Sequence, residues 1–96
     1  MKVKDLREGM KRVSIEAKVT EKSDPREVQS RVRDETYMVA DAVIADETGS
    51  IKLTLWNEQI DLVNVNDVVK IENGYVTSFR GEMQLNAGKY GKLTVT

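Results

Sequence analysis

The chain has 96 residues, of which 40% are hydrophobic and 32% are charged, a balance typical of a single globular domain. It contains no histidine and no cysteine, which excludes disulfides, the usual zinc sites and Ser/His or Cys/His nucleophile pairs. No apolar run reaches the roughly 20 residues of a membrane-spanning helix, and the amino-terminal residues lack the apolar core of a signal peptide. We therefore expect one domain over residues 1–96, in the cytoplasm, with no catalysis, no cofactor, no metal and no membrane contact.

The net charge of −1 at pH 7 does not by itself indicate a nucleic-acid-binding protein, for which a strongly basic balance would be expected. The charges are unevenly distributed, however. Residues 34–47 hold five acidic side chains and no basic one, whereas basic residues outnumber acidic ones in residues 70–96. Any site for nucleic acid is therefore predicted to be a local basic patch on a nearly neutral molecule.

The first third of the chain predicts a lead-in, a strand and a polar connection. Residues 1–12 form the lead-in, with Leu6 and Met10 packed against the core. Residues 13–20 alternate between apolar and polar side chains, which predicts a strand. Residues 23–36 are polar and half of them are charged, and a connection of this length inside a small domain is usually functional or disordered.

The middle of the chain predicts a hairpin followed by a short helix. Residues 37–45 are almost continuously apolar, which indicates a strand covered on much of both faces. A tight turn over residues 47–50 leads to a strand over residues 51–56. In that strand the apolar side chains Ile51, Leu53 and Leu55 face one side, and Lys52, Thr54 and Trp56 face the other. Asn57 is then expected to cap a short helix whose apolar residues are Ile60, Leu62 and Val63.

The last third predicts two or three more strands. Residues 68–79 contain Asn73-Gly74, which indicates either a hairpin turn or a glycine bulge in one long strand. We favour the bulge, because residues 68–72 are too few to pair back across a two-residue turn. Arg80-Gly81 is expected to turn the chain into a strand over residues 82–86, and residues 93–95 complete the last one.

This order predicts an all-β fold: a five-stranded Greek-key barrel of the OB-fold type, with one short helix between strands three and four. An SH3-like barrel or another small barrel is compatible with the alternation alone. The position of the helix favours the OB-fold.

Three aromatic side chains are predicted to lie away from the core. Trp56, the only tryptophan, shares a strand face with Lys52 and Thr54. Tyr75 and Phe79 share one face of the later strand, whereas Val76 points to the other face. Phe79 is followed directly by Arg80. Aromatic rings beside cations suit base stacking, worth about 1–3 kcal/mol per base. Rings at strand ends also commonly cap a barrel core, so each residue alone leaves both interpretations open.

The sequence resembles the archaeal single-stranded-DNA-binding OB-fold proteins, their simple eukaryotic relatives and, more distantly, replication protein A. The resemblance covers about residues 13–96 and rests on five segments: ADETGSI at 45–51, LW at 55–56, NDVV at 66–69, GYV at 74–76 and FRG at 79–81. The lead-in DLREGM at 5–10 is similar to the start of archaeal replication protein A-like OB domains. One departure is Leu85-Asn86, where simple relatives often carry another aromatic; Tyr90 is the candidate substitute.

The resemblance implies non-catalytic binding of single-stranded DNA in replication or repair, at an intracellular, nucleoid-associated location. It implies that Trp56, Tyr75 and Phe79 stack on bases. The cations expected at phosphates are Lys52 and Arg80, together with the loop residues Arg31, Arg33, Lys89 and Lys92.

Two other functions fit the same barrel. One is RNA binding, in which loop contacts and the 2′-hydroxyl would provide specificity. The other is an assembly module whose aromatic face docks other OB domains or replication and repair proteins.

Overall fold

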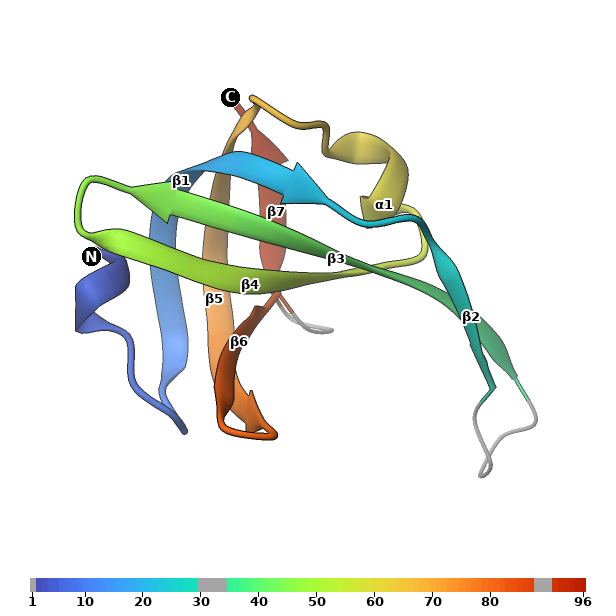
Figure 1. Ribbon diagram of the computed structural model, residues 1–96, viewed down its shortest axis with the longest axis horizontal. Coiled ribbons are helices and arrows are strands. Elements are labelled where there is room, and N and C mark those ends of the chain that lie inside the picture. The colour runs from blue at the N-terminus through green and yellow to red at the C-terminus, as the bar shows by residue number, and fades with distance from the viewer. Residues whose placement is uncertain (1, 30–34, 88–90) are drawn as a thin grey trace.

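The computed structural model describes residues 2–29, 35–87 and 91–96, with every side chain in them except that of Phe79. Over these residues the chain forms strands joined by short turns and one helical turn (Figure 1). In chain order the elements are the 3-10 helix η1 (Val3–Asp5), β1 (Lys11–Lys22), β2 (Arg26–Gln29), β3 (Thr36–Asp46), β4 (Gly49–Trp56), α1 (Gln59–Leu62), β5 (Val68–Phe79), β6 (Glu82–Asn86) and β7 (Lys92–Val95).

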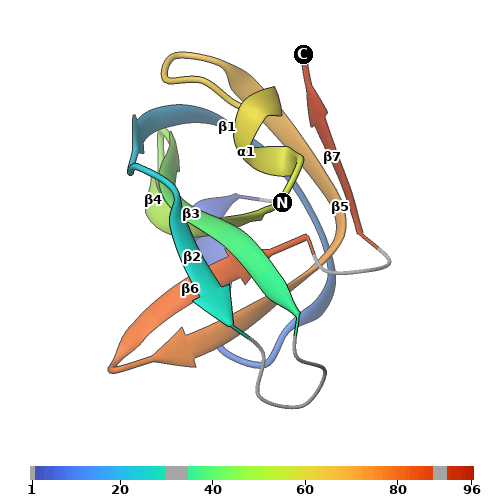
Figure 2. The same ribbon diagram turned by 90° about the vertical axis from the view of Figure 1, so that its right-hand side faces the viewer.

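Five of these strands close into a barrel. The long strand β1 pairs antiparallel with both β3 and β5, β3 pairs with β4, and β5 pairs with β6. A parallel pairing of β4 with β6 completes the ring. The predicted all-β, five-stranded OB-fold barrel is confirmed, and its third and fourth predicted strands are β4 and β5, which α1 connects (Figures 1 and 2).

The core follows from the alternation of the strands. In β1 the side chains of Val13, Ile15, Ala17 and Val19 are buried and their neighbours are exposed. Leu6 is fully buried and Met10 packs partly against the core, as expected for the lead-in. Since alternate residues of each strand fill the barrel, the outward residues are the ones available for binding.

The amino-terminal segment is tied to the β3–β4 turn. Asp46 accepts the Val3 N–H at 2.9 Å through one carboxylate oxygen and the Thr48 N–H and hydroxyl through the other. The Lys4 N–H donates to the Thr48 hydroxyl at 3.1 Å, and Lys2 forms an ion pair with Glu47. The hydrogen bond from the Thr48 side chain is the largest of the causes that lower the pKa of Asp46 to about 2.

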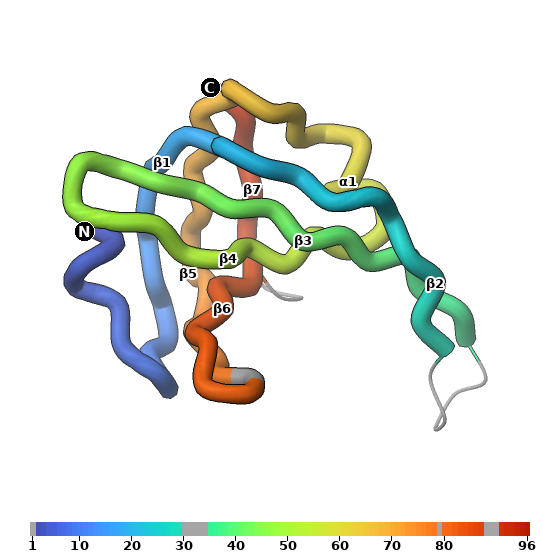
Figure 3. The backbone as a smooth tube through the Cα atoms, in the orientation of Figure 1, coloured from blue at the N-terminus to red at the C-terminus, as the bar shows by residue number. Residues whose placement is uncertain are grey.

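The polar connection predicted over residues 23–36 is wrong in part, because Arg26–Gln29 forms the strand β2. Its register against β3 runs from Arg26 opposite Val39 to Gln29 opposite Thr36. The β2–β3 ribbon projects beyond the barrel (Figures 1 and 3). All residues of β2 are exposed, so pairing with β3 rather than core burial makes it a strand, and the sequence carries no alternation to reveal it.

The expected helix cap at Asn57 is also wrong. The residue at the N-cap of α1 is Glu58, without a side-chain capping bond. Asn57 has a φ of 51°, and its side-chain oxygen accepts the Met38 N–H at 3.1 Å. The Asn57 side-chain oxygen therefore accepts a hydrogen bond from a residue distant in sequence and does not cap the helix.

The glycine bulge in β5 is confirmed. Residues 68–79 form one continuous strand, and the pairing with β1 skips from Ile15 opposite Ile71 to Val13 opposite Gly74. A Cβ on Gly74 would lie 2.9 Å from the Asn86 carbonyl oxygen and 2.9 Å from the Ile71 side chain. The barrel therefore requires glycine here because two strands approach closely, and the hairpin alternative does not hold.

Candidate nucleic-acid interface

The outward residues of β4 line a shallow groove on the barrel. Lys52, Thr54 and Trp56 alternate with side chains of the core, as the spacing predicted. The groove has a volume of about 330 Å³, and the other residues that line it are Arg26, Val28, Val39, Asp41, Gln84 and Asn86. We call it the outer groove.

Trp56 is the last residue of β4, lines the outer groove and is 37% exposed. The edge of the Tyr37 ring meets the Trp56 ring at a centroid distance of 6.2 Å and an interplanar angle of 84°. The Trp56 N–H donates to the Gln59 side chain at 3.1 Å, which fixes the backbone at the end of β4. The ring is therefore supported by a neighbouring strand while part of it stays open to solvent.

Tyr75 lies on the same side of the sheet as Trp56. Cross-strand partners face the same side, and Thr54 is opposite Asn86, which in turn is opposite Tyr75. Two strand spacings and two residues along a strand separate the Cα atoms of Trp56 and Tyr75 by roughly 12 Å. Tyr75 is 37% exposed, so two accessible rings flank Asn86.

The surface between the two rings is formed by polar side chains that are buried. Thr54 and Asn86 are buried side chains that face outward from the barrel. The Asn86 amide donates to the Thr77 hydroxyl at 3.2 Å, and no described residue that is buried has an unsatisfied side-chain N or O atom. The Asn86 amide on the groove floor is therefore already held in position.

The cations at the outer groove are paired with carboxylates. The Lys52 ammonium lies 3.2 Å from a Glu82 carboxylate oxygen, and the Arg26 guanidinium lies 3.0 Å from Asp41. Since these pairs partly cancel the positive charge, the groove is less basic than its lysine and arginine suggest. The sequence reasoning anticipated Lys52 but not its partner.

The other predicted cations lie elsewhere. Arg80 and Gly81 both have positive φ, at 53° and 82°, and form the turn between β5 and β6, with the Arg80 side chain exposed. Lys92 is on β7, opposite Glu72 in the first half of β5, and does not line the outer groove.

All the predicted contacts remain expectations, and five of them fall on side chains that the structure does not describe. The backbone of Phe79 ends β5 opposite Glu82, but its side chain is outside what the structure describes. The other four also lie outside the described residues: Arg31, Arg33, Lys89 and Tyr90.

Several groove residues were missed from the sequence. Arg26 and Val28 come from the unexpected strand β2, Val39 and Asp41 from β3, and Gln84 and Asn86 from β6. Tyr37, which does not line the groove but contacts the tryptophan ring, was missed as well. The alternation of Asn86 with the buried Leu85 could have placed it outward. The residues of β2 could not have been found without the register against β3.

No cluster of acidic residues suited to a metal ion occurs in the part of the chain that the structure describes. Within the same residues, no helix is long and apolar enough to cross a membrane.

Comparison with known proteins identifies the family. The sequence profile of the OB-fold family described as single-stranded DNA binding protein Ssb-like matches residues 7–95. The chain belongs to this family. The resemblance to archaeal single-stranded-DNA-binding OB-fold proteins that was inferred from the sequence is thereby confirmed.

Two relatives and one solved structure agree with this membership. The chain is 39% identical over 92 residues to the single-stranded DNA binding protein Ssb of Saccharolobus solfataricus, which covers 96% of this chain and 61% of that protein. It is 35% identical over 78 residues to replication factor A of Methanothermobacter thermautotrophicus, which covers 80% of this chain and 10% of that protein. An OB domain from Thermoplasma acidophilum, solved by NMR, superposes with a TM-score of 0.85 at 26% identity and covers 100% of this chain and 85% of that one. The chain thus spans about three-fifths of the Saccharolobus protein and a tenth of the replication factor.

Proposed function

We propose that the chain is a single OB-fold module, over residues 1–96, that binds single-stranded DNA without catalysis. The observation that carries the proposal is the pair of exposed rings, Trp56 and Tyr75, on one side of the sheet with the hydrogen-bonded Asn86 between them. Stacked bases need flat apolar surfaces that are accessible but anchored. The names of the two relatives, a single-stranded DNA binding protein and a replication factor, support the same choice of ligand.

In this proposal each residue has a role that follows from the chemistry of its side chain. Trp56, Tyr75 and Phe79 stack on successive bases. Thr54 contributes a hydroxyl from the groove floor, and Lys52 and Arg80 contact phosphates. The remaining predicted contacts are the loop and edge residues Arg31, Arg33, Lys89, Tyr90 and Lys92.

The cellular setting is proposed by analogy with the relatives. We place the protein in DNA replication or repair, associated with the nucleoid. A lone OB-fold with a net charge of −1 would bind weakly, so partners that bring other OB domains close would raise the affinity through effective concentration.

The test uses Trp56 as its own reporter, since it is the only tryptophan. Stacking on a base should quench its emission as oligothymidine is added in low salt, and Tyr75→Ala should weaken binding by about 1–3 kcal/mol. Leu62→Ala, at an exposed position away from the outer groove, is the matched control. Unchanged emission at high micromolar protein and DNA would reject the proposal.

Competition separates DNA from the alternatives. An RNA oligomer of the same sequence that displaces the DNA at lower concentration would assign the groove to RNA. A Trp56→Ala, Phe79→Ala double variant that stays folded, keeps DNA binding and loses a protein partner would favour the assembly module.

A further inference from the structure

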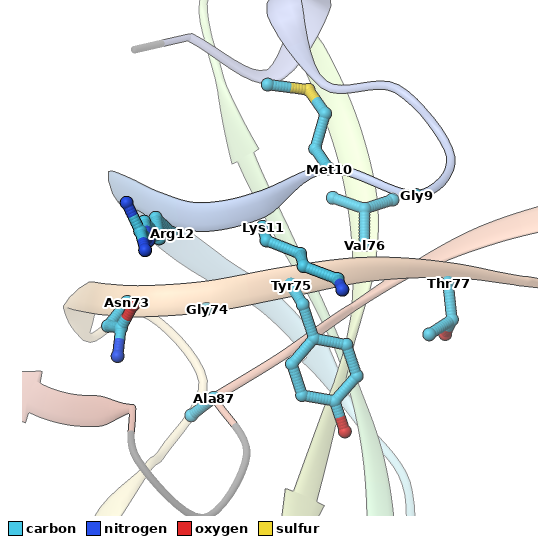
Figure 4. A pocket seen from close by; sticks show the side chains of 10 residues that line it. All are labelled: Gly9, Met10, Lys11, Arg12, Asn73, Gly74, Tyr75, Val76, Thr77 and Ala87. Carbon is cyan, nitrogen blue, oxygen red and sulfur yellow. The ribbon is translucent and has the colours of Figure 1, made fainter.

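A second cavity lies beside the outer groove, where β1, β5 and the residue after β6 meet. Its volume is about 470 Å³, and it is lined by residues 9–12, by residues 73–77 of β5 and by Ala87 (Figure 4). Pockets of about 300–1,000 Å³ accommodate small ligands, so this volume is ample for one nucleotide. We call it the bulge cavity.

Two irregularities in the β1–β5 pairing flank this cavity. Arg12 is an extra residue between the pairs Lys11–Tyr75 and Val13–Gly74, and Asn73 belongs to the bulge of β5. Both have a φ of 56°, a left-handed conformation that is uncommon outside glycine. Bulges redirect side chains at barrel rims and near binding sites, and here Arg12 and Asn73 lie together at one end of the cavity (Figure 4).

The charge of the bulge cavity differs from that of the outer groove. Lys11 and Arg12 line it, and none of the acidic residues that the structure describes does. Neither cation forms an ion pair or a side-chain hydrogen bond with any residue that the structure describes. In the groove, by contrast, Lys52 and Arg26 are each neutralised by a carboxylate.

The apolar part of the cavity suits a base. The Tyr75 side chain projects from β5 on the side opposite the buried Val76, and Lys11 extends toward it from the neighbouring strand (Figure 4). An exposed aromatic ring beside two cations that pair with none of the described residues offers a stacking surface and a phosphate contact, the two features by which proteins bind single-stranded nucleic acid.

The bulge cavity continues the outer groove. Cross-strand pairing gives one row from Thr54 to Asn86, Tyr75 and Lys11, over β4, β6, β5 and β1. Asn86 lines the groove and its partner Tyr75 lines the cavity. Three strand spacings make this row about 14 Å long, so a strand that leaves the groove past Tyr75 reaches the cavity without a turn.

We propose that the bulge cavity holds one further nucleotide of the strand that occupies the outer groove. Its base is the one that stacks on Tyr75, and its phosphate contacts Lys11 and Arg12. The inference rests on the proposed function and adds to it a second, more strongly cationic subsite at the end of the groove.

The test measures affinity against strand length with a charge-matched control. Oligothymidines of three to eight nucleotides are titrated into the wild-type protein and into the Lys11→Gln, Arg12→Gln double variant. Lys4→Gln, Lys18→Gln removes the same charge at exposed positions that line neither the groove nor the cavity. Circular dichroism and the unfolding midpoint confirm that each variant is folded.

We expect the wild type and the Lys4, Lys18 control to gain about five- to tenfold in affinity at the length that reaches the cavity, as one stacked base would provide. The Lys11, Arg12 variant should lose this gain, with a salt slope lower by up to about 1.4, and should bind the shortest strands as the control does. Amide signals of Gly9 and Gly74 should shift only with the longer strands.

Each other outcome has a distinct meaning. Equal length dependence in both double variants overturns the subsite and leaves the proposed function intact. Full shifts of Gly9 and Gly74 with thymidine monophosphate alone would overturn it in favour of an independent nucleotide site. No binding of any oligomer to the wild type would reject the proposed function itself.

Discussion

Trp56 combines exposure with support from two directions, which matters more for binding than exposure alone. The edge of Tyr37 contacts its ring and Gln59 holds its backbone N–H. A side chain that is already ordered loses less conformational entropy when a base stacks on it, and each rotamer-rich side chain ordered on binding costs about 0.5–1.5 kcal/mol. Tyr37 is therefore expected to influence binding without contacting the ligand.

Replacing Tyr37 should test this support. Tyr37→Leu removes the edge contact, and we expect DNA affinity to fall by about 0.5–1.5 kcal/mol, the usual worth of an aromatic pair, while Trp56 anisotropy decreases. Tyr37→Phe keeps the ring and loses only the hydroxyl that donates to Glu35 at 2.5 Å, so it should bind as the wild type does. Equal binding by both variants would show that the ring of Trp56 needs no support.

The pairing of Lys52 with Glu82 gives a second prediction at this scale. Glu82→Gln should free the Lys52 ammonium for phosphate and remove a negative charge, so affinity should rise in low salt and the salt slope should steepen by about 0.7. Glu72→Gln is the matched control, because it frees Lys70 from an ion pair of 3.3 Å away from the groove. A similar gain in both variants would mean that overall charge, not Lys52, is responsible.

At the scale of elements, the sequence predicted the strands whose alternate residues fill the core. It missed the features that depend only on pairing between distant segments. The strands of the barrel were found because their apolar residues alternate toward the core, as Ile51, Leu53 and Leu55 do. The strand β2 was missed because it is exposed throughout. The cap at Asn57 was wrong because Met38, distant in sequence, supplies the donor.

The same division applies to the candidate site. The parity of Trp56 and Tyr75 could be deduced locally, but their placement on either side of Asn86 depends on the parallel β4–β6 register. The ion pair of Lys52 with Glu82 depends on that register too. Contacts between strands far apart in sequence have no local signature, so neither could be predicted.

The bulge in β5 yields a stability prediction. Gly74→Ala would place a Cβ 2.9 Å from the Asn86 carbonyl oxygen and from the Ile71 side chain, and we expect it to lower the free energy of unfolding by about 1–3 kcal/mol, as overpacking does. A Cβ added at Gly81 would meet no atom within 4 Å, but Gly81 has a φ of 82°. Gly81→Ala therefore measures the cost of backbone strain without steric crowding. Chemical denaturation measures both, and a Gly74→Ala variant as stable as the wild type would contradict the close approach.

The amino-terminal tie to the β3–β4 turn yields a pH prediction. The pKa of Asp46 in the folded protein is about 2, lowered from its ordinary value of 3.8, chiefly by the Thr48 hydroxyl. A depressed folded pKa contributes stability above the unfolded pKa, and that contribution is lost as pH falls from about 4 toward 2. Asp46→Asn should therefore flatten the stability curve in this window.

The measurement is the free energy of unfolding between pH 2 and pH 6. Asp24→Asn is the control, at an exposed carboxylate that makes no side-chain hydrogen bond or ion pair with the described residues. Parallel curves for Asp46→Asn and the wild type would show that the tie does not couple to folding.

At the scale of the whole molecule, a net charge of −1 limits how strongly phosphates can be attracted. With Lys52 and Arg26 paired, we expect only about two to four of the proposed cations to contact phosphates at the same time. We expect the logarithm of the binding constant to fall against the logarithm of salt concentration with a slope of about −1 to −3, at about 0.7 per phosphate contact. Titrations from 20 to 300 mM salt measure it, and a slope beyond −5 would mean that binding is mainly electrostatic rather than by stacking.

The strand β1 pairs with β3 over one part of its length and with β5 over most of the rest, so the barrel closes only when residues 11–22 meet residues 68–79. Such contacts span more than half the chain, and topologies built on distant pairings fold on the millisecond-to-second scale rather than in microseconds. During synthesis β1 emerges long before β5. The first strand of this protein must therefore wait for most of the chain before its pairing, and with it the bulge cavity, can form.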